Sequence, residues 1–383
     1  MAQKKILIVC GEASGDLNAG ALARKVLELK PGVKIFGVGG ESLRSAGAEI
    51  AFDIRGLSVI GLFDVIRKLP RFFALKDKLL KLAQKEMFDL IILVDFSGFN
   101  LRFAKAIDKK IPIIYYVGPQ VWASRQGRIK TIEEYISKMI VLFKFEEEFY
   151  KSHGVDVSFA GHPLLDIAKP SMAKKELLAN LGLSEKKIAI SLLPGSRKGE
   201  IKYILPIMLG SCRGILRSMD AQFIIAKSPQ VDWEIYKNII KKSGLEVKIV
   251  EGKTYDCLNC ADFSLVASGT ATLEAALIGN PFVVIYKMNP LNYMLYRPQV
   301  KLPYIGMVNI VAGREIIPEF IQFRATTKNI SQEVIRLLKN GAELEKMKQN
   351  LSRIRSSLGE PGASLRAAQI IIRDLNKEYP TGN

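Results

Sequence analysis

The chain has 383 residues, of which 48% are apolar, and its formal net charge is +18. The length exceeds that of one typical domain and the apolar content excludes a disordered chain, so we expect two globular domains of similar size. Lys and Arg (56) outnumber Asp and Glu (38), which predicts an anionic partner: a nucleic acid, an acidic lipid or a phosphorylated substrate. Charge alone does not choose among these three.

The cysteines and the start of the chain indicate a compartment. Four cysteines are too few for a disulfide scaffold and are typical of a reducing environment. Cys257 and Cys260 form one CxxC pair without a second, and only two histidines accompany it, so we expect no metal site. The first residues lack the features of a signal peptide, and no apolar run approaches the ~18 residues of a membrane span. We therefore expect a cytoplasmic protein that can lie on a membrane surface.

The first half alternates short apolar runs with helical patterns, which is typical of a parallel α/β sheet. Residues 4–10 predict a strand that enters a glycine loop, followed by a helix at residues 19–29. Glu12, Ser14 and Asp16 lie in this loop, where a doubly wound sheet places ligand contacts, although loop capping explains them equally well. The further predicted strands of this sheet are residues 34–36, 90–94, 112–117, 139–143 and 157–159.

Polar residues that follow these strands are candidates for chemistry. Asp95 stands at the carboxyl end of a central strand, where catalytic groups of a parallel sheet collect, or it caps the next helix. Trp122 lies in the loop after residues 112–117 and is one of only two tryptophans. His162, between Gly161 and Pro163, is either catalytic or a hydrogen-bonding residue at a hinge.

Residues 57–83 carry apolar side chains at helical spacing, interleaved with basic ones. We expect Pro70 to divide this helix into two pieces. Such a surface can lie on anionic lipid or receive acyl chains, and it can equally be an ordinary crossover helix with a solvated basic face. The candidate lipid-contacting residues are Arg67, Leu69, Arg71, Phe72 and Phe73.

The second half begins after a lysine-rich linker at residues 166–187, with a strand at residues 188–193. The loop Gly195-Ser196-Arg197 then opens a helix, so its free amides and the guanidinium of Arg197 predict an anion site. Further strands are expected at residues 223–226, 247–250 and 263–267. Helices are expected at residues 328–358 and 362–377, the last of which can return to the first domain.

Residues 263–287 read as strand, loop, helix and strand. Ser268-Gly269-Thr270 offers a turn and a hydroxyl that can cap the helix, whose free amides suit a phosphate. We expect Glu274 in the first helical turn, where its carboxylate can accept hydrogen bonds from the hydroxyls of a ribose or can simply complement the helix dipole. This stretch predicts nucleotide binding.

Six motifs in order over nearly the whole chain resemble the lipid-A-disaccharide synthase family, whose layout is that of GT-B glycosyltransferases and sugar-nucleotide 2-epimerases. They are Gly11-Glu12-Ala13-Ser14-Gly15-Asp16, residues 116–122, Gly161-His162-Pro163, Leu193-Pro194-Gly195-Ser196-Arg197, residues 268–274 and residues 309–315. The resemblance implies a GT-B fold, α/β, with two doubly wound domains facing across a cleft. We expect an acceptor and acyl-binding domain at residues 1–166, a UDP-sugar domain at 167–358, and a C-terminal helix at 359–383 that packs back on the first domain.

The resemblance also implies an activity. The family moves 2,3-diacylglucosamine from its UDP carrier to the 6-hydroxyl of 2,3-diacylglucosamine 1-phosphate, which gives a β-1,6 disaccharide 1-phosphate and UDP in lipid A (lipopolysaccharide) biosynthesis. It implies inversion without a metal or other cofactor, at the inner face of the cytoplasmic membrane, by an enzyme that can be a dimer. The implied nucleotide-binding residues are Gly195, Ser196, Arg197, Ser268, Gly269, Thr270, Glu274 and Asn309; the acceptor loops contribute Glu12, Ser14, Asp16 and Trp122; the catalytic candidates are Asp95 and His162.

One departure and two rival functions accompany this reading. Family members usually have Pro at the position of Ser97, and some have Asp at that of Gly98, so Asp95 is left as the only carboxylate of its loop. A UDP-N-acetylglucosamine 2-epimerase would share the fold but act on an unacylated sugar. A nucleic-acid-binding protein would explain the charge but not Glu274 beside an anion site.

Overall fold

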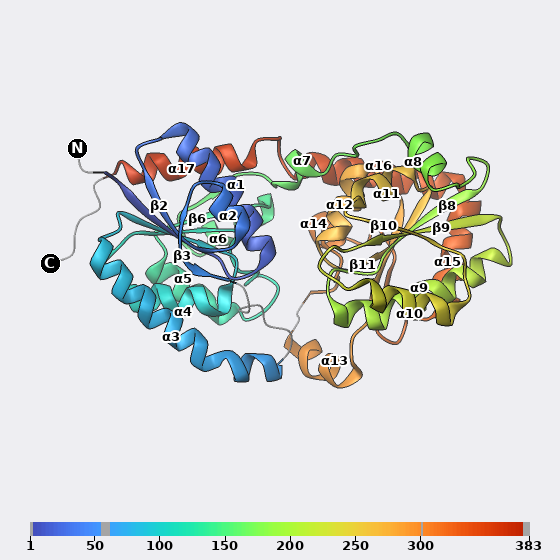
Figure 1. Ribbon diagram of the computed structural model, residues 1–383, viewed down its shortest axis with the longest axis horizontal. Helices are drawn as coiled ribbons and strands as arrows, with labels where there is room; N and C mark the ends of the chain where they lie inside the picture. Colours follow the sequence, from blue (N-terminus) through green and yellow to red (C-terminus); the bar gives the residue numbers. More distant parts are fainter. Residues whose placement is uncertain (1–2, 55–61, 300–301, 378–383) are drawn as a thin grey trace. The chain divides into compact units, whose positions relative to one another are not determined.

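The computed structural model describes residues 3–54, 62–299 and 302–377. The chain divides into two compact units. Unit 1 consists of Met1–Pro163 with Leu358–Asn383, and unit 2 consists of Leu164–Ser357. Each unit is built around one parallel sheet, in agreement with the predicted α/β class (Figure 1). None of the described helices is long and apolar enough to cross a membrane.

The sheet of unit 1 has seven strands in the order β3-β2-β1-β4-β5-β6-β7. Its central strands consist of apolar residues that are buried on both faces, as the sequence predicts for a parallel sheet. Strand β3 was not predicted, because it is a half-exposed edge strand that begins and ends with an acid. The strands are β1 Lys5–Val9, β2 Lys34–Gly39, β3 Glu49–Asp53, β4 Leu90–Val94, β5 Ile113–Tyr116, β6 Lys138–Val141 and β7 Val157–Phe159.

Two helices of unit 1 differ from the prediction. Helix α1 begins at Ala13 rather than at residue 19, because the small residues after Glu12 already form its first turn. Helix α3 runs through Pro70 without a break, since apolar side chains such as Leu75 and Leu79 pack it against the core. The helices of this unit are α1 Ala13–Leu29, α2 Glu41–Ser45, α3 Leu62–Glu86, α4 Ser97–Ile107, α5 Ile129–Tyr135, α6 Lys144–Ser152 and α17 Ala363–Leu375.

The C-terminal helix α17 returns to unit 1 and packs on α1 (Figure 1), which confirms the expected return of the chain end. Its apolar face, which includes Ala367 and Ile371, is fully buried. The Nζ of Lys30, at the end of α1, donates a hydrogen bond of 2.6 Å to the side-chain oxygen of Asn376. Residues more than three hundred positions apart thus complete one core.

The sheet of unit 2 has six parallel strands in the order β10-β9-β8-β11-β12-β13. The short strand β13 was not predicted. The strands are β8 Ile188–Leu193, β9 Ala221–Lys227, β10 Lys248–Glu251, β11 Phe263–Ala267, β12 Phe282–Tyr286 and β13 Glu319–Ile321. The helices are α7 Leu164–Ile167, α8 Lys174–Asn180, α9 Lys198–Leu216, α10 Trp233–Ser243, α11 Thr254–Cys260, α12 Thr270–Ile278, α13 Pro290–Tyr296, α14 Met307–Ala312, α15 Thr327–Lys339 and α16 Gly341–Ser357.

The helix predicted at residues 328–358 is two helices in the structure. Asn340 separates them: its backbone leaves the helical region at the end of α15. Its side-chain oxygen then accepts a hydrogen bond of 3.2 Å from the amide of Glu343 in the first turn of α16. An asparagine that satisfies a free amide in this way favours a new helix start over continuation.

Candidate functional site

Both sheets reverse their strand order at one point, and several of the candidate residues follow the strands beside it. In unit 1 the reversal falls at β1 and β4, and in unit 2 at β8 and β11. Loops after such strands diverge to opposite faces of the sheet, so the carboxyl ends leave a crevice for a ligand. Asp95 follows β4, whereas the predicted anion loop and the residues around Gly269 follow β8 and β11.

Asp95 lies in a strained turn that other residues hold in place. Asp95 and Phe96 have φ angles of 50° and 49°, which non-glycine residues rarely adopt. The Asp95 amide donates to the carbonyl of Val117 at 3.2 Å. The Asp95 carbonyl accepts hydrogen bonds from the side-chain amide of Asn100 at 2.8 Å and from the hydroxyl of Tyr115 at 2.6 Å. Three contacts therefore fix the backbone that carries the carboxylate.

The ring of Phe96 joins this turn to its surroundings. It stacks on Phe99, with ring centroids 5.3 Å apart, and meets the edge of Phe72 at 5.7 Å. A Cβ atom at Gly11, in the loop after β1, would collide with the Phe96 ring. This close approach explains why glycine begins the first motif, a reason that the sequence alone did not give.

A basic side chain, that of Arg128, binds the Asp95 loop at Ser97. The guanidinium of Arg128 donates a hydrogen bond of 2.9 Å to the hydroxyl of Ser97, the residue that departs from the family pattern. Partial burial and then the nearby charge of Arg125 and Arg102 lower the pKa of Arg128. Sequence reasoning missed Arg128, Asn100 and Tyr115 as supports of this loop, because their contacts depend on the three-dimensional packing of β4, β5 and α4.

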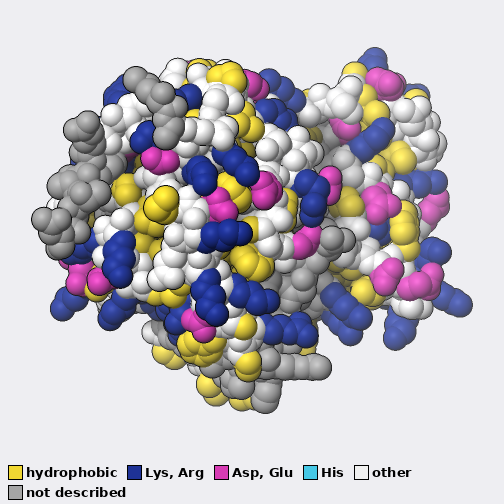
Figure 2. All heavy atoms as spheres, turned by 60° about the vertical axis from the view of Figure 1, so that its left-hand side comes forward, with side chains coloured by type: hydrophobic (Ala, Val, Ile, Leu, Met, Phe, Trp, Pro, Cys, Tyr) yellow, Lys and Arg dark blue, Asp and Glu magenta, His cyan; other side chains and the backbone are white. Residues whose placement is uncertain are grey.

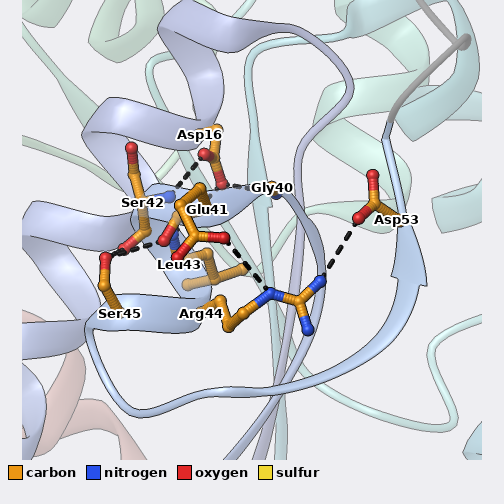
Figure 3. A network of polar contacts seen from close by, with 8 residues as sticks. All are labelled: Asp16, Gly40, Glu41, Ser42, Leu43, Arg44, Ser45 and Asp53. Atoms are coloured by element: carbon orange, nitrogen blue, oxygen red, sulfur yellow. Dashed lines mark hydrogen bonds and ion pairs between the residues drawn. The ribbon is translucent and has the colours of Figure 1, made fainter.

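The structure gives Asp16 a role inside the chain. Its carboxylate points to the start of α2 and accepts hydrogen bonds from the amides of Gly40 (2.7 Å), Ser42 (2.9 Å) and Leu43 (3.2 Å), as Figure 3 shows. Asp16 is buried, whereas Ser14 is exposed and Glu12 is half-buried beside it. Of the three candidates in this loop, Asp16 fixes the α2 turn, and Ser14 presents its hydroxyl to solvent.

Trp122 is buried and anchors its loop rather than presenting its ring to solvent. Its indole Nε1 donates a hydrogen bond of 3.0 Å to Glu146, and its ring meets the edge of Phe145. The other carboxylate oxygen of Glu146 accepts hydrogen bonds from the amides of Leu142 and Phe143, both at 3.2 Å. Burial outweighs these donors and raises the pKa of Glu146 to about 7. Sequence reasoning missed this carboxylate because no helix was predicted at residues 144–152, so the capping position of Glu146 did not stand out.

His162 is buried at the end of unit 1. Its ring lies 5.2 Å from that of Phe143, and burial lowers its pKa to about 4. Its backbone amide donates to the carbonyl of Leu358 at 3.0 Å, where the chain re-enters unit 1. Arg366 stabilises the same place, where the chain re-enters unit 1, because its guanidinium donates hydrogen bonds to the carbonyls of Ala160, Glu360 and Pro361. The backbone contact joins two residues of unit 1, at the places where the chain leaves this unit and re-enters it.

The candidate lipid segment is the amino-terminal half of α3. The side chains of Arg67 and Leu69 lie outside the described residues, as do residues 57–61. Phe72 packs inward against Phe96 and Phe99, whereas Phe73 is 50% exposed and Arg71 is exposed. Figure 2 shows Lys and Arg side chains spread widely over one face of the molecule. Of the candidate lipid-contacting residues whose side chains are described, Phe73 and Arg71 are therefore the exposed ones.

In unit 2, the loop after β8 already holds a carboxylate of its own chain. Gly195 has a φ of 107°, which suits glycine. The amides of Ser196 and Arg197 donate to one oxygen of Glu200 at 3.2 and 3.3 Å, and the Arg197 guanidinium lies 3.4 Å from the other. Ser196 and Arg197 are exposed. The loop thus has the donors of an anion site, and Glu200 occupies the place of the anion.

The loop after β11 corrects two expectations. No side-chain hydroxyl caps α12, because Ser268 donates its hydroxyl hydrogen bond to the carbonyl of Ile305 at 3.1 Å and Gly269 is the N-cap. Glu274 lies beyond the first turn, since α12 starts at Thr270. Its carboxylate is half-buried and accepts a hydrogen bond of 3.1 Å from the hydroxyl of Tyr255, and burial raises its pKa.

Asn309 is fully buried and serves the loop between α14 and β13. Its side-chain oxygen accepts from the amides of Ile316 (2.8 Å) and Ile317 (3.0 Å), while its nitrogen donates to the carbonyl of Ile317 (2.7 Å) and to Glu319 (2.8 Å). Glu319 in turn accepts from the amide of Ile305, whose carbonyl bonds Ser268. Asn309 therefore supports the loop that positions Ser268.

A family model described as lipid-A-disaccharide synthetase matches residues 6–372. The lipid-A-disaccharide synthase of Syntrophus aciditrophicus (strain SB) is 40% identical over 380 residues, which are 98% of this chain and 99% of that protein. That of Geobacter metallireducens is 40% identical over 379 residues, 98% of each chain. The chain belongs to the lipid-A-disaccharide synthase family. It is a glycosyltransferase of lipid A biosynthesis, EC 2.4.1.182, which confirms the activity that the motifs implied.

Solved structures are similar to the chain in fold. The UDP-GlcNAc 2-epimerase of Neisseria meningitidis has a TM-score of 0.63 at 14% identity and covers 98% of this chain and 100% of its own. A glycosyltransferase of Rickettsia africae ESF-5 has a TM-score of 0.59 at 11% identity and covers 99% and 100%. At such low identity the likeness concerns the fold alone, and it confirms the GT-B class. Within the described residues no cluster of His, Cys, Asp and Glu could hold a metal ion.

Proposed function

We propose that this lipid-A-disaccharide synthase works by direct displacement, with Asp95 as the general base that takes the proton from the acceptor's 6-hydroxyl. The observation that carries this proposal is the strained turn at Asp95, where Asn100, Tyr115 and Val117 all bind the main chain and thereby fix the position of the residue that carries the carboxylate. Strain of ~1–3 kcal/mol per residue persists where function requires a fixed geometry. Inversion needs one base on the face of the sugar opposite to UDP.

His162 is the alternative base, and its surroundings argue against it. Taking up the proton would place a positive charge on a buried imidazole, and burial disfavours that charge and lowers the pKa of His162 to about 4. Its ring also packs on Phe143 inside unit 1. We therefore assign His162 a structural role at the place where the chain re-enters unit 1, because its amide donates a hydrogen bond to the carbonyl of Leu358.

The nucleotide is assigned to unit 2. Arg197 and the amides of Gly195, Ser196 and Gly269 would bind the pyrophosphate, because they lie at the starts of two helices beside the strand reversal. Glu200 would leave the amides when the phosphates arrive. Glu274 would accept hydrogen bonds from ribose hydroxyls, with Tyr255 holding its carboxylate and Ser268 and Thr270 shaping the loop.

The acceptor and its acyl chains are assigned to unit 1. Arg128 binds Ser97 in the Asp95 loop, Arg125 and Arg102 lie near enough to Arg128 to lower its pKa, and the three guanidinium groups suit the 1-phosphate of the acceptor. The exposed side chains of Phe73 and Arg71 on α3 would contact the anionic inner face of the cytoplasmic membrane, from which both acylated substrates come. A homodimer would be compatible with this arrangement.

The decisive experiment compares Asp95→Asn with His162→Gln in steady-state turnover and UDP binding. Asp95→Asn keeps the shape of the side chain and loses its basicity, so we expect kcat to fall about 10²–10⁴-fold with UDP affinity unchanged. His162→Gln should retain most of the turnover. Near-full turnover of Asp95→Asn together with an inactive His162→Gln variant would make His162 the base and Asp95 a structural residue of the turn.

A further inference from the structure

Several large apolar side chains of unit 2 lie in water at one place. Leu291, Met294 and Leu295 on α13 are 67%, 69% and 53% exposed, and Phe323 is 74% exposed. Leu291, Met294 and Leu295 share one helix face because they are three and four positions apart. The ring of Phe323 lies 6.2 Å from that of Tyr293 at an angle of 89°, so it packs beside the same helix. We call Leu291, Met294, Leu295 and Phe323 the α13 patch.

The base of the α13 patch is firmly built. The amide of Met288 donates to the side-chain oxygen of the buried Gln322, whose nitrogen donates back to the Met288 carbonyl, at 3.2 and 3.1 Å. The Nζ of Lys287 donates to the carbonyl of Ala325 at 3.2 Å. Asn289 caps α13 by accepting from the amide of Leu291 at 2.9 Å. Polar contacts thus hold the segments before α13 and around Phe323 together while their apolar side chains point outward.

The residues next to the α13 patch in the sequence are basic rather than acidic. No Asp or Glu lies between Glu274 and Glu315 in the sequence. Arg297 follows α13 and is exposed, and Arg324 is exposed beside Phe323. An apolar surface with exposed cations at its border matches an anionic bilayer, whose headgroups bind the cations while the apolar side chains enter the acyl boundary.

The position of α13 connects it with the nucleotide loop. Helix α13 follows β12, so it leaves the same carboxyl edge of the sheet as the loop containing Arg197. Arg197 and Glu200 lie close enough to Tyr286, the last residue of β12, to affect its pKa, which burial chiefly raises. A membrane contact at this edge would bring the candidate donor site to the surface where a diacylated donor resides.

We propose that the α13 patch is a second membrane-docking element, which inserts into an anionic lipid surface beside the nucleotide loop of unit 2. An acyl-chain pocket would have to be concave, whereas these side chains protrude with half to three-quarters of their surface in water. A stable dimer interface needs roughly 800 Å² from each partner, which four side chains do not supply. The proposal uses the family's acylated substrates and does not depend on the role of Asp95.

The test places a fluorescent reporter on the α13 patch. The native cysteines are all buried, so Met294→Cys offers a selective attachment point for an environment-sensitive dye. We expect a blue shift of its emission with phosphatidylglycerol vesicles and a much smaller one with phosphatidylcholine vesicles. Leu216→Cys is the matched control, because Leu216 is 43% exposed at the far end of α9, at the opposite edge of the same sheet. The emission of a dye attached at position 216 should not shift with either kind of vesicle.

A second arm measures binding. Leu291→Ser combined with Met294→Ser and Phe323→Ser should weaken partition into phosphatidylglycerol vesicles at least about tenfold, because three large apolar side chains are lost from the contact. Replacing three exposed apolar residues elsewhere, Leu29, Met87 and Leu216, by Ser should change it little. The patch variant should keep its turnover on short-chain substrates without vesicles, so a failure of this arm is distinguishable from a failure of the catalytic proposal.

Four outcomes would overturn the proposal. In the first, the emission of the dye at position 294 does not shift with phosphatidylglycerol vesicles, or shifts no more than that of the dye at position 216. In the second, the emission at position 294 shifts with protein concentration alone, which would indicate contact between copies of the chain. In the third, it shifts with a short-chain donor in the absence of vesicles, which would indicate an acyl-chain site. In the fourth, the patch variant binds vesicles as the wild type does, which would leave α3 as the docking element.

Discussion

Replacing Glu146 by Gln should change how the stability of unit 1 depends on pH. Glu146 is buried, and its two oxygens accept hydrogen bonds from Trp122 and from the amides of Leu142 and Phe143. Its pKa in the folded chain is about 7. In the unfolded chain a glutamate titrates near ~4.3. The folded state therefore binds this proton more tightly than the unfolded state does.

The difference between the two pKa values sets the direction and the size of the change in stability with pH. A raised folded-state pKa gives stability that is fully present below the unfolded pKa and is lost as the pH rises through about 7. The gap between the two pKa values corresponds to roughly 4 kcal/mol at most over the full titration. Glu146→Gln cannot titrate. The free energy of unfolding of the wild type, relative to this variant, should thus fall by up to roughly 3 kcal/mol between about pH 4.5 and pH 8.

The assay is urea unfolding followed by tryptophan fluorescence at several pH values. Trp233→Phe in both proteins leaves Trp122 as the reporter of unit 1. Glu147→Gln is the matched control: Lys144 and Lys151 pair with Glu147, and its pKa is lowered, so its effect should be constant between pH 5 and 8. A constant difference between wild type and Glu146→Gln would show that the three donors keep Glu146 ionised, and would refute the reasoning.

Three further predictions concern the two sites and the lipid surface. Arg197→Ala should weaken UDP binding by about 2–4 kcal/mol and Glu274→Ala by roughly 1–3 kcal/mol in calorimetry, and unchanged affinity in both folded variants would contradict their assignment. Phe73→Ser and Arg71→Glu should each reduce the fraction of protein that sediments with anionic vesicles. The binding free energy should weaken by roughly 1 kcal/mol for each basic residue removed, and equal binding of wild type and variants would make α3 an ordinary crossover helix. Tyr115→Phe should lower kcat up to about tenfold with unchanged UDP affinity, because one hydrogen bond to the Asp95 carbonyl is lost, and an unchanged kcat would show that the turn does not need it.

The strands of both sheets were largely predictable because their apolar runs are buried on both faces. Asp95 was predictable as a site candidate for the same reason: a polar residue directly after a fully buried strand stands out. Its supports were not predictable, since Tyr115 and Asn100 reach the Asp95 carbonyl only through the packing of β5 and α4 beside β4. The sequence shows which side chains are polar and does not show which main-chain groups they meet.

The same limit explains the candidates whose surroundings differ from the prediction. Asp16 and Asn309 stand in family motifs, but their polar atoms bind main-chain groups of their own unit. Helical spacing could not distinguish Phe72, which packs inward, from Phe73, which is exposed. Glu274 was placed in the first turn because the helix was expected to begin after the Ser268-Gly269-Thr270 turn, whereas α12 already begins at Thr270.

The most direct test of the central claim is a product assay with the purified protein. The protein is incubated with UDP-2,3-diacylglucosamine and 2,3-diacylglucosamine 1-phosphate, and mass spectrometry follows UDP and the disaccharide 1-phosphate. The account predicts that both products form in equal amounts, only when both acylated substrates are present. Epimerisation of unacylated UDP-N-acetylglucosamine, with no disaccharide from the acylated pair, would contradict it.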